Sequence, residues 1–385
     1  MRIAYCAHVR LPSERAHGHQ IAHVCDALAK LGHDVTLFAP MRRSAIEQDY
    51  HTYYGAEKAV QVTYLPSFDQ HTLPIGKGFI GLFLSNISLR RAFRKALAGV
   101  QFDLLYTRSP VLLPPLLSSG IPVLLELHQL PRHNQKAFVR LCNRCRSVAC
   151  LTSPMRGELL QLGVDASKLL VEGDAVNLFE FQGMPSASEA RKHIGFQTNR
   201  MVVGYVGRLK TLEMEKGVAE LLNALSMAKA ERLFFGLVVG GPEQDKKQYE
   251  AMAASLKLTA DDVRFTGEVP AAAVPTALAA CDVLVMPFPD KPHYRKYMSP
   301  LKMFEYMASG KPIVTSDLPP VRDVLSEKAA VFCEPGNADS LLRALRFIIA
   351  NPDDAADRAH AASALVQEHS WEKRMERILA SAHLS

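Results

Sequence analysis

Short apolar runs alternate with stretches of helical periodicity along the first half of the chain. Within residues 20–31, Ile21, Val24, Cys25 and Leu28 fall on one face of a helix, which predicts an amphipathic helix ending near Gly32. The apolar runs have the length of buried strands and lie at 3–7, 35–39, 104–107, 123–127 and 148–151. Short strands separated by helices predict a parallel sheet with helices on both faces.

The same alternation begins again near residue 201. A helix is expected over 217–229, among strands at 202–206, 234–239, 263–266, 283–287, 313–316 and 331–333. Because 385 residues exceed the usual size of one compact core, we expect two domains. The small, polar, proline-bearing stretch 183–188 is the predicted linker, which gives domains 1–183 and 184–370. Ser370 is suited to cap a final helix.

The excess of positive charge is confined to the first half. Residues 1–185 hold 20 Lys and Arg against 14 Asp and Glu, and the rest of the chain is balanced, for a net charge of +6. This asymmetry predicts an anionic partner for the first domain, such as a phosphorylated lipid or the inner membrane face. Nucleic acid is not expected as a partner, because no run interleaves aromatic and basic residues.

Residues 78–97 combine large apolar side chains with bases, namely Phe79, Leu82, Phe83 and Phe93 beside Arg90, Arg91, Arg94 and Lys95. Two interpretations stay open: an interfacial helix that touches anionic lipid, or a surface helix packed on the sheet. No apolar run reaches the roughly 18–20 residues of a bilayer span, and the N-terminus lacks a signal core. We therefore expect a cytoplasmic protein, either free or peripheral on the inner membrane face.

Several motifs are missing from the sequence. The seven cysteines have no regular spacing, and Cys142 and Cys145 form a Cys-x-x-Cys pair without a second pair to complete a zinc site. There is no Asp-x-Asp, so neither a metal nor another cofactor is expected. The absence of Gly-x-Gly-x-x-Gly, of a P-loop and of Gly-x-Ser-x-Gly disfavours dehydrogenases, P-loop enzymes and serine hydrolases.

Two segments of the second half have the chemistry of a phosphate site. Gly204–Leu209 ends a strand, and Arg208 and then Lys216 bracket the loop before the next helix. Glycine lets backbone approach a phosphate closely, and two cations would offset a diphosphate. In 299–310, Ser-Pro predicts a helix start with Pro300 as its first residue, where free amides favour an anion. The alternatives are a solvated charged loop and, for Glu305, a carboxylate that only favours the helix dipole.

Two residues of the first half are weaker candidates. His128 follows the strand 123–127 and could face a ligand at the sheet edge, although a packed histidine is the more frequent case. Gly18 precedes the first helix, where its backbone could approach a phosphate.

Taken together, these motifs resemble glycosyltransferase family 4, the retaining group with the GT-B fold. The most specific match is SPLKMFEYMASGKPIVTSD at 299–317, which is similar to the donor-binding helix and the strand that follows it. Gly207-Arg208-Leu209 with Lys216-Gly217 resembles the family's diphosphate site. The segments 239–243 and 265–269, and the closing Ser370-Trp371-Glu372, also fit the family pattern.

The resemblance implies an α/β architecture of two Rossmann-like domains that face across a cleft, with 371–385 returning to the first domain. The first domain would bind the acceptor and the second the nucleotide-sugar. Arg208 and Lys216 would bind the diphosphate, Glu305 the ribose and His128 the donor sugar, with Gly18 beneath the phosphates. Further donor-binding positions would be Gly207, Gly241, Gly267, Val269, Tyr297, Ser299, Leu301 and Lys302, the last two mainly through backbone amides.

The sequence departs from the family at two places. The family often has two acids eight residues apart; Glu305 is the second, and Tyr297 stands in place of the first. The loop from Arg208 to Lys216 is longer than usual, through the residues 211–215. We interpret this as a longer loop that still returns the lysine to the site.

The expected function is metal-independent, retaining transfer of a hexose-type sugar from a UDP-, GDP- or ADP-sugar to a hydroxyl of a glycan or lipid-linked acceptor, in surface polysaccharide or glycolipid synthesis. The alternatives are a non-catalytic sugar-nucleotide-binding protein, another GT-B enzyme such as a nucleotide-sugar 2-epimerase, and a Rossmann dehydrogenase. The sequence does not identify the sugar, the base or the acceptor.

Overall fold

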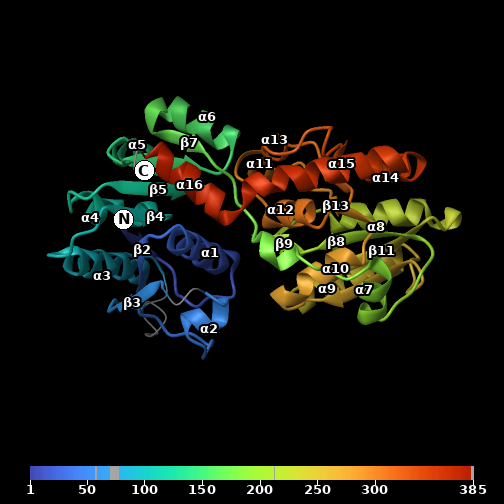
Figure 1. Cartoon of the computed structure of the whole chain (residues 1–385), viewed down its shortest axis with the longest axis horizontal. Coiled ribbons are helices and arrows are strands. Elements are labelled where there is room, and N and C mark those ends of the chain that lie inside the picture. Colours follow the sequence, from blue (N-terminus) through green and yellow to red (C-terminus); the bar gives the residue numbers. More distant parts are fainter. Residues whose placement is uncertain (57–58, 70–77, 212, 383–385) are drawn as a thin grey trace. The chain divides into compact units, whose positions relative to one another are not determined.

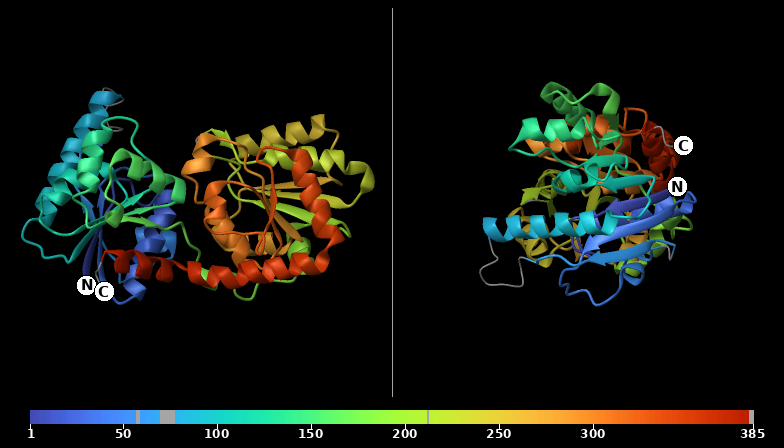
Figure 2. Two further views of the ribbon diagram at one scale, coloured as in Figure 1. Left: turned by 90° about the horizontal axis from the view of Figure 1, so that it is seen from above. Right: turned by 90° about the vertical axis from the view of Figure 1, so that its left-hand side faces the viewer.

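The chain folds into two compact units in the computed structural model, which describes residues 1–56, 59–69, 78–211 and 213–382 (Figure 1). Unit 1 comprises Met1–Gly173 and the chain from Trp371 onward, and unit 2 comprises Asp174–Ser370. Each unit contains a parallel sheet between two layers of helices (Figure 2). The predicted pair of Rossmann-like domains is therefore present.

The described residues of unit 1 form a seven-stranded parallel sheet in the order β3-β2-β1-β4-β5-β6-β7. Its strands are β1 (Arg2–Cys6), β2 (Asp34–Pro40), β3 (Gln61–Leu65), β4 (Leu104–Thr107), β5 (Val123–Leu127), β6 (Ser147–Cys150) and β7 (Leu169–Val171). The five expected strands are all present, and β4, β5 and β6 are buried along their whole length. The two unpredicted strands, β3 and β7, form the sheet edges: exposed positions dilute the apolar pattern of β3, and β7 is only three residues long.

The helices of unit 1 are α1 (Ala16–Lys30), α2 (Tyr50–Tyr54), α3 (Phe79–Leu97), α4 (Leu113–Leu117), α5 (Gln135–Cys142), α6 (Ser153–Leu162) and α16 (Trp371–Ser381). Helix α1 begins at Ala16, four residues before the predicted start at residue 20. The sequence does not mark this start, because the first turn is polar and the N-cap residue Arg15 forms no side-chain capping hydrogen bond. Helix α16 packs against α1: the ring of Trp371 stacks on His23 with 5.2 Å between centroids.

The described residues of unit 2 form a six-stranded parallel sheet in the order β12-β11-β8-β13-β14-β15. Its strands are β8 (Met201–Val206), β11 (Phe234–Val239), β12 (Val263–Gly267), β13 (Val283–Met286), β14 (Ile313–Ser316) and β15 (Val331–Cys333). All six were predicted. A separate antiparallel hairpin, β9 (Lys210–Thr211) and β10 (Met214–Glu215), occupies the long loop after β8, with Leu212 outside the described residues.

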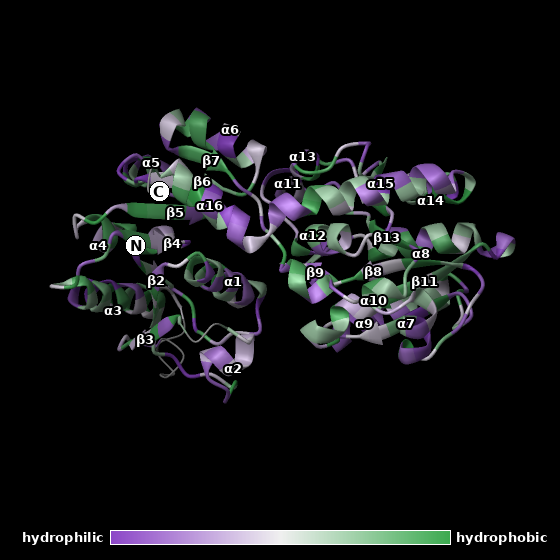
Figure 3. Cartoon of the chain, in the orientation of Figure 1, coloured by the Kyte–Doolittle hydropathy of each residue, from purple (hydrophilic) through white to green (hydrophobic). Residues whose placement is uncertain are grey.

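The helices of unit 2 are α7 (Ala187–Ile194), α8 (Val218–Met227), α9 (Glu243–Ser255), α10 (Val274–Ala279), α11 (Pro292–Lys296), α12 (Leu301–Ala308), α13 (Pro319–Arg322), α14 (Ala338–Ala350) and α15 (Pro352–Leu365). Two separate apolar clusters cover the two faces of the sheet, one around Tyr306 and one around Tyr205. The strands of both units are mostly hydrophobic (Figure 3).

The division between the units falls at Gly173 and Asp174, before the linker expected at 183–188. The second half of that stretch is the start of α7: Ser186 is its N-cap and forms a reciprocal capping box with Glu189, which accounts for the small polar residues there. Residues before it already belong to unit 2, because the Val176 amide donates to the His369 carbonyl at 3.1 Å. The predicted boundary therefore lies inside unit 2.

Candidate active site

The carboxyl edge of the unit 2 sheet brings two glycine turns into contact. Gly207 follows β8 with φ 134°, and Gly240 follows β11 with φ 150°, both conformations that favour glycine. A Cβ on Gly240 would lie 2.0 Å from the Gly207 carbonyl oxygen, so no side chain fits between the turns. The result is bare backbone at the end of the central strands, where α/β sheets bind ligands.

Arg208 lies on this turn, where hydrogen bonds fix the backbone and the side chain is exposed. The Tyr205 hydroxyl donates to the Arg208 carbonyl at 2.8 Å. The Tyr306 hydroxyl of α12 accepts from the Val206 amide at 2.8 Å and donates to the Val206 carbonyl at 3.0 Å. Two buried tyrosines thus fix the end of β8, and the guanidinium forms no hydrogen bond or ion pair within the described part of the chain.

Lys216 returns to the same edge through the β9–β10 hairpin, as the sequence interpretation required. Burial and then the charge of Arg208 lower the pKa of Lys216 to about 8, so the two cations lie within electrostatic reach of one another. Gly217 follows with φ 95° as the N-cap of α8, and a Cβ there would lie 2.0 Å from the Pro287 carbonyl oxygen. The hairpin therefore brings the Lys216 ammonium within electrostatic reach of the Arg208 guanidinium.

Tyr294 of α11 is a positioning residue that the sequence did not reveal. Its buried hydroxyl donates to the carbonyl of Glu215, the residue directly before Lys216, at 2.7 Å. The neighbouring residue His293 also interacts electrostatically with Lys216, since burial and then the charge of Lys216 lower the pKa of the His293 imidazole. No local spacing could have linked α11 to a hairpin some eighty positions earlier.

Helix α12 begins at Leu301 and not at Pro300, which is a correction to the predicted start. Pro300 is the N-cap, with φ −83° and ψ 121°, and no side chain caps the helix. The Met303 amide donates to the Pro300 carbonyl at 2.9 Å, which leaves the amides of Leu301 and Lys302 at the helix start. Ser299 is engaged elsewhere, because its Oγ accepts from the Asp174 amide at 2.7 Å.

Two titratable side chains of α12 are desolvated. Burial raises the pKa of Glu305 to about 7, against the opposing charge of Lys302. The Lys302 side chain runs beneath the Gly207 turn, where a Cβ on Gly207 would lie 3.3 Å from Lys302 Cε. The helix start thus carries a carboxyl and an ammonium that both lack the solvation they would have in water.

The other predicted donor-binding positions lie around the same edge or next to it. Gly267 ends β12 with φ 81°, and Gly241 follows β11, with its Cβ position 3.0 Å from Glu268 Cβ. Val269 is half-buried against the apolar core. Tyr297 closes α11, with its ring centroid 6.1 Å from that of His293.

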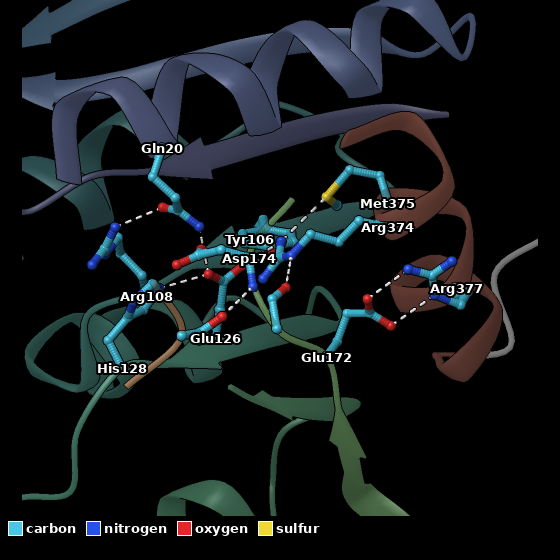
Figure 4. Close-up of polar contacts among 12 residues, drawn as sticks. Gln20, Tyr106, Arg108, Glu126, His128, Glu172, Asp174, Arg374, Met375 and Arg377 are labelled. Atoms are coloured by element: carbon cyan, nitrogen blue, oxygen red, sulfur yellow. Dashed lines mark hydrogen bonds and ion pairs between the residues drawn. The ribbon is translucent and has the colours of Figure 1, made fainter. Parts of the chain in front are cut away.

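A buried carboxylate organises the second candidate region, in unit 1 (Figure 4). Glu126 of β5 has no exposed surface, and its Oε1 accepts from Gln20 Nε2 at 2.5 Å and from His128 Nε2 at 2.6 Å. Its Oε2 accepts from the Tyr106 hydroxyl and, at 3.2 Å, from Arg374 Nη1 of α16. Arg108 joins through Gln20, donating from Nη1 to Gln20 Oε1 at 2.6 Å.

The electrostatics of this network fix the form of His128. Burial alone would raise the pKa of Glu126, but Arg374, His128 and Arg108 together hold it well below its usual range. Burial and then Arg108 lower the pKa of His128 to about 4, so its ring is neutral near pH 7. Because the ionised carboxylate can only accept, Nε2 carries the proton and Nδ1 is left as an acceptor.

Gly18 lies in the first turn of α1 and not in the loop before it. Its amide already donates to the Arg15 carbonyl at 2.8 Å. A Cβ there would lie 2.2 Å from the Tyr54 hydroxyl oxygen, so close packing accounts for the glycine. A phosphate contact at Gly18 stays a prediction, and it would need this amide to exchange its partner.

The sequence missed Gln20, Arg108, Glu126 and Arg374 as members of one site. Glu126 is two residues from His128, but Arg374 lies 248 positions after Glu126, on α16.

In the part of the chain that the structure describes, no helix is long and apolar enough to cross a membrane, and no three His, Cys, Asp or Glu side chains gather as a metal site. Cys142 and Cys145 are buried free thiols.

Comparison with known proteins identifies both halves. The family model described as Glycosyltransferase Family 4 matches residues 18–176, and the model described as Glycosyl transferases group 1 matches residues 200–351. The chain is 31% identical to the 2-deoxystreptamine N-acetyl-D-glucosaminyltransferase of Streptomyces fradiae over 224 residues, which are 56% of this chain but only 49% of that relative. It is 24% identical to the phosphatidyl-myo-inositol mannosyltransferase of Mycolicibacterium smegmatis over 91% of this chain and 85% of that one.

Solved structures agree on the fold. The Anabaena protein HepE, solved in complex with UDP-glucose, is 19% identical and has a TM-score of 0.74, covering 100% of this chain and 99% of its own. At this level of identity the likeness concerns the fold, which is GT-B. With both units matched by family models, the chain belongs to glycosyltransferase family 4.

Proposed function

We propose that the protein transfers a sugar, with retention of configuration, from a nucleoside-diphosphate sugar to an acceptor hydroxyl in glycolipid or surface polysaccharide synthesis. The observation that carries the proposal is the convergence of Arg208, Lys216 and the uncapped start of α12 on one glycine-lined sheet edge. Two cations and a helix N-terminus form a site for a diphosphate. The names of the relatives, and the UDP-glucose bound to HepE, support a nucleotide-sugar donor.

The chemistry follows from where negative charge develops. The bond between the anomeric carbon and the β-phosphate oxygen breaks, and the diphosphate leaves with the electron pair. The acceptor oxygen then bonds to the anomeric carbon on the face that the diphosphate leaves, and its proton passes to the departing phosphate. Arg208, Lys216 and the amides of Leu301 and Lys302 stabilise that phosphate, while Glu305 accepts hydrogen bonds from the ribose. Nδ1 of neutral His128 accepts a hydrogen bond from the donor sugar.

A donor screen tests this function. Thermal unfolding of the purified chain is measured with UDP-, GDP- and ADP-sugars, and release of nucleoside diphosphate is then followed with and without sugar and lipid acceptors. Stabilisation by one nucleotide class and acceptor-dependent release are expected. Stabilisation without any acceptor-dependent release would make the protein a sugar-nucleotide-binding protein, and no stabilisation would contradict the donor site.

Donor affinity is expected to peak in a narrow pH window. Below about 7, Glu305 is protonated and stops accepting from the ribose; above about 8, Lys216 loses its charge. The dissociation constant of a UDP-sugar, whose diphosphate lacks the terminal ionisation of UDP, should therefore rise on both sides of this window when it is measured by calorimetry from pH 5.5 to 9.5. Glu305→Gln should abolish the acidic limb alone, and an unchanged acidic limb would remove the ribose role.

We also propose that the acceptor is presented at an anionic lipid surface, which α3 contacts. Its inner face is packed, with Leu89 and Phe93 fully buried, whereas Ile80 is 71% and Phe83 54% exposed. The packed face supports the interpretation as a surface helix, and the exposed face supports the proposed lipid contact. A groove of about 930 Å³ lies along this helix and has both apolar and basic walls. It is lined by the apolar residues Pro66, Phe68, Leu84 and Ile87 and by the bases Arg91, Arg94 and Lys95. An apolar, cationic surface suits an anionic lipid headgroup and its chains.

Sedimentation with vesicles tests this contact. The protein is expected to bind vesicles that contain phosphatidylglycerol at low salt and to leave neutral phosphatidylcholine vesicles and high salt. Arg91→Glu combined with Arg94→Glu should abolish the binding. Arg132→Glu with Lys136→Glu makes the same charge change on exposed residues elsewhere in unit 1 and should bind normally. Equal loss in both double variants would mean that only the net charge matters.

A further inference from the structure

Lys302 carries a buried amine without a hydrogen-bond partner among the described residues. Its side chain is 6% exposed, and among the described residues its Nζ forms no hydrogen bond. Nζ lies 3.6 Å from the centroid of the Tyr205 ring and 5.5 Å from that of Phe288, so aromatic faces are its nearest stabilising surroundings. An isolated ammonium in such a place is costly, and an apolar residue of the same length would be easier to bury.

The position of this group relative to the glycine turn suggests a reason for its cost. A Cβ on Gly207 would lie 3.6 Å from Nζ. The amino group of Lys302 therefore lies close to the turn that carries Arg208, on the side where Gly207 has no side chain. Lys302 is also the second residue of α12, whose first amides have no side-chain cap. The ammonium, the turn and the helix start thus share one corner of unit 2.

We propose that the Lys302 ammonium is a third cation of the diphosphate site, acting from beneath the Gly207 turn alongside Arg208 and Lys216. The inference rests on the proposed function, because it names a further residue for the same donor. A diphosphate above the turn would give the Lys302 ammonium the negatively charged partner that it lacks in the empty site. Because Gly207 has no Cβ, the flexible lysine side chain could pass it and bring Nζ to a phosphate oxygen.

The charge state of Lys302 should then depend on the ligand. Burial and next the charge of Lys216 lower the pKa of Lys302 well below its usual value, while Glu305 opposes the shift. The ammonium is therefore less favoured in the empty site than in water, and the negative charge of an arriving diphosphate would raise the pKa of Lys302 again. Binding of the donor should consequently take up a proton at Lys302.

Calorimetry of UDP binding to the full chain at pH 8, in two buffers of different ionisation enthalpy, measures this uptake. At that pH Glu305 is already ionised, and Lys216, with a pKa of about 8, accounts for at most about half a proton. An uptake clearly above this amount is expected for the wild type. An uptake of half a proton or less would overturn the proposal without any variant.

Lys302→Met provides the second measurement, since methionine keeps the stem and removes the charge. We expect UDP to bind about tenfold more weakly or worse, with proton uptake reduced, whereas the melting temperature of the empty protein rises. A merely structural lysine would not give weaker binding together with higher stability. Lys328→Met, at an exposed position of the same unit, removes one charge as a control and should change neither quantity.

The outcomes separate this inference from the proposed function. Wild-type protein that binds UDP while Lys302→Met binds it equally well would overturn the role of Lys302 alone. Wild-type protein that binds none of UDP, GDP and ADP would overturn the donor site, and the inference with it. A Lys302→Met variant that does not fold would leave the wild-type proton uptake to decide.

Discussion

Replacing Arg208 with alanine is expected to lower turnover by about a hundredfold or more, with a smaller effect on the structure of unit 2. The guanidinium is exposed and forms no ion pair within the described residues, so its removal breaks no packing, whereas the turn beneath it stays fixed by Tyr205 and Tyr306. One donor aimed at charge that develops in the transition state is worth about a hundred- to a thousandfold in turnover. Steady-state release of nucleoside diphosphate measures the effect.

Arg343→Ala is the matched control, because this exposed arginine of α14 lies outside the candidate site. Its turnover should equal that of the wild type. If Arg208→Ala also retained near-normal turnover, Arg208 would have no role in stabilising the leaving diphosphate. A variant with lower turnover and unchanged melting temperature would localise the loss to catalysis.

The largest effect on stability is expected from Glu126→Ala, at about 3–5 kcal/mol in the free energy of unfolding of unit 1. This change removes the Glu126 carboxylate to which Arg374, Gln20 and Tyr106 donate, and Arg374 has no exposed surface. Buried donors that lose a shared acceptor keep their desolvation cost, while the attraction to that acceptor is lost. The network also orients His128, so activity should fall as well.

Trp371 gives this prediction a local readout. It is the single tryptophan of the chain, and it is buried in unit 1 against His23. Denaturant unfolding followed by its fluorescence therefore reports on unit 1. Glu376→Ala, at an exposed position of α16, should shift the unfolding free energy by less than about 0.5 kcal/mol. Equal stability of the Glu126 and Glu376 variants would contradict a stabilising role for the buried carboxylate.

Features coded by contiguous residues were predictable from the sequence. The strands β8 and β11 are unbroken apolar runs, and the Arg208 and Lys216 motif follows β8 directly, so its place at the sheet edge could be derived. The start of α12 was predicted within one residue, because Ser-Pro marks helix starts but does not say whether proline is the N-cap or the first residue. Ser186 and Glu189 have the spacing of a capping box, but the small polar residues around them equally favour a linker, and the structure has the capping box.

Features that depend on distant contacts were not predictable. Glu126 and Arg374 meet only because α16 packs on unit 1, and Tyr294 reaches Glu215 only because α11 packs on the hairpin. Gly18 is only a weak candidate for a phosphate contact, and the sequence gives no sign that the Tyr54 hydroxyl lies beside it, a contact between two separate helices. Burial is likewise a tertiary property, so the paired shifts at Lys216 and Glu305 could not be derived from spacing.

The return of α16 to unit 1 imposes an order on biosynthesis. A ribosome releases the N-terminal part first, and domains commonly fold as they emerge. Here Glu126 is synthesised long before Arg374, and all of unit 2 is made between them. The nascent first unit must therefore wait with an interior carboxylate that still lacks the Arg374 guanidinium, and it reaches its final stability only after α16 has been translated. Truncation within α16 should consequently harm the half of the protein that was made first.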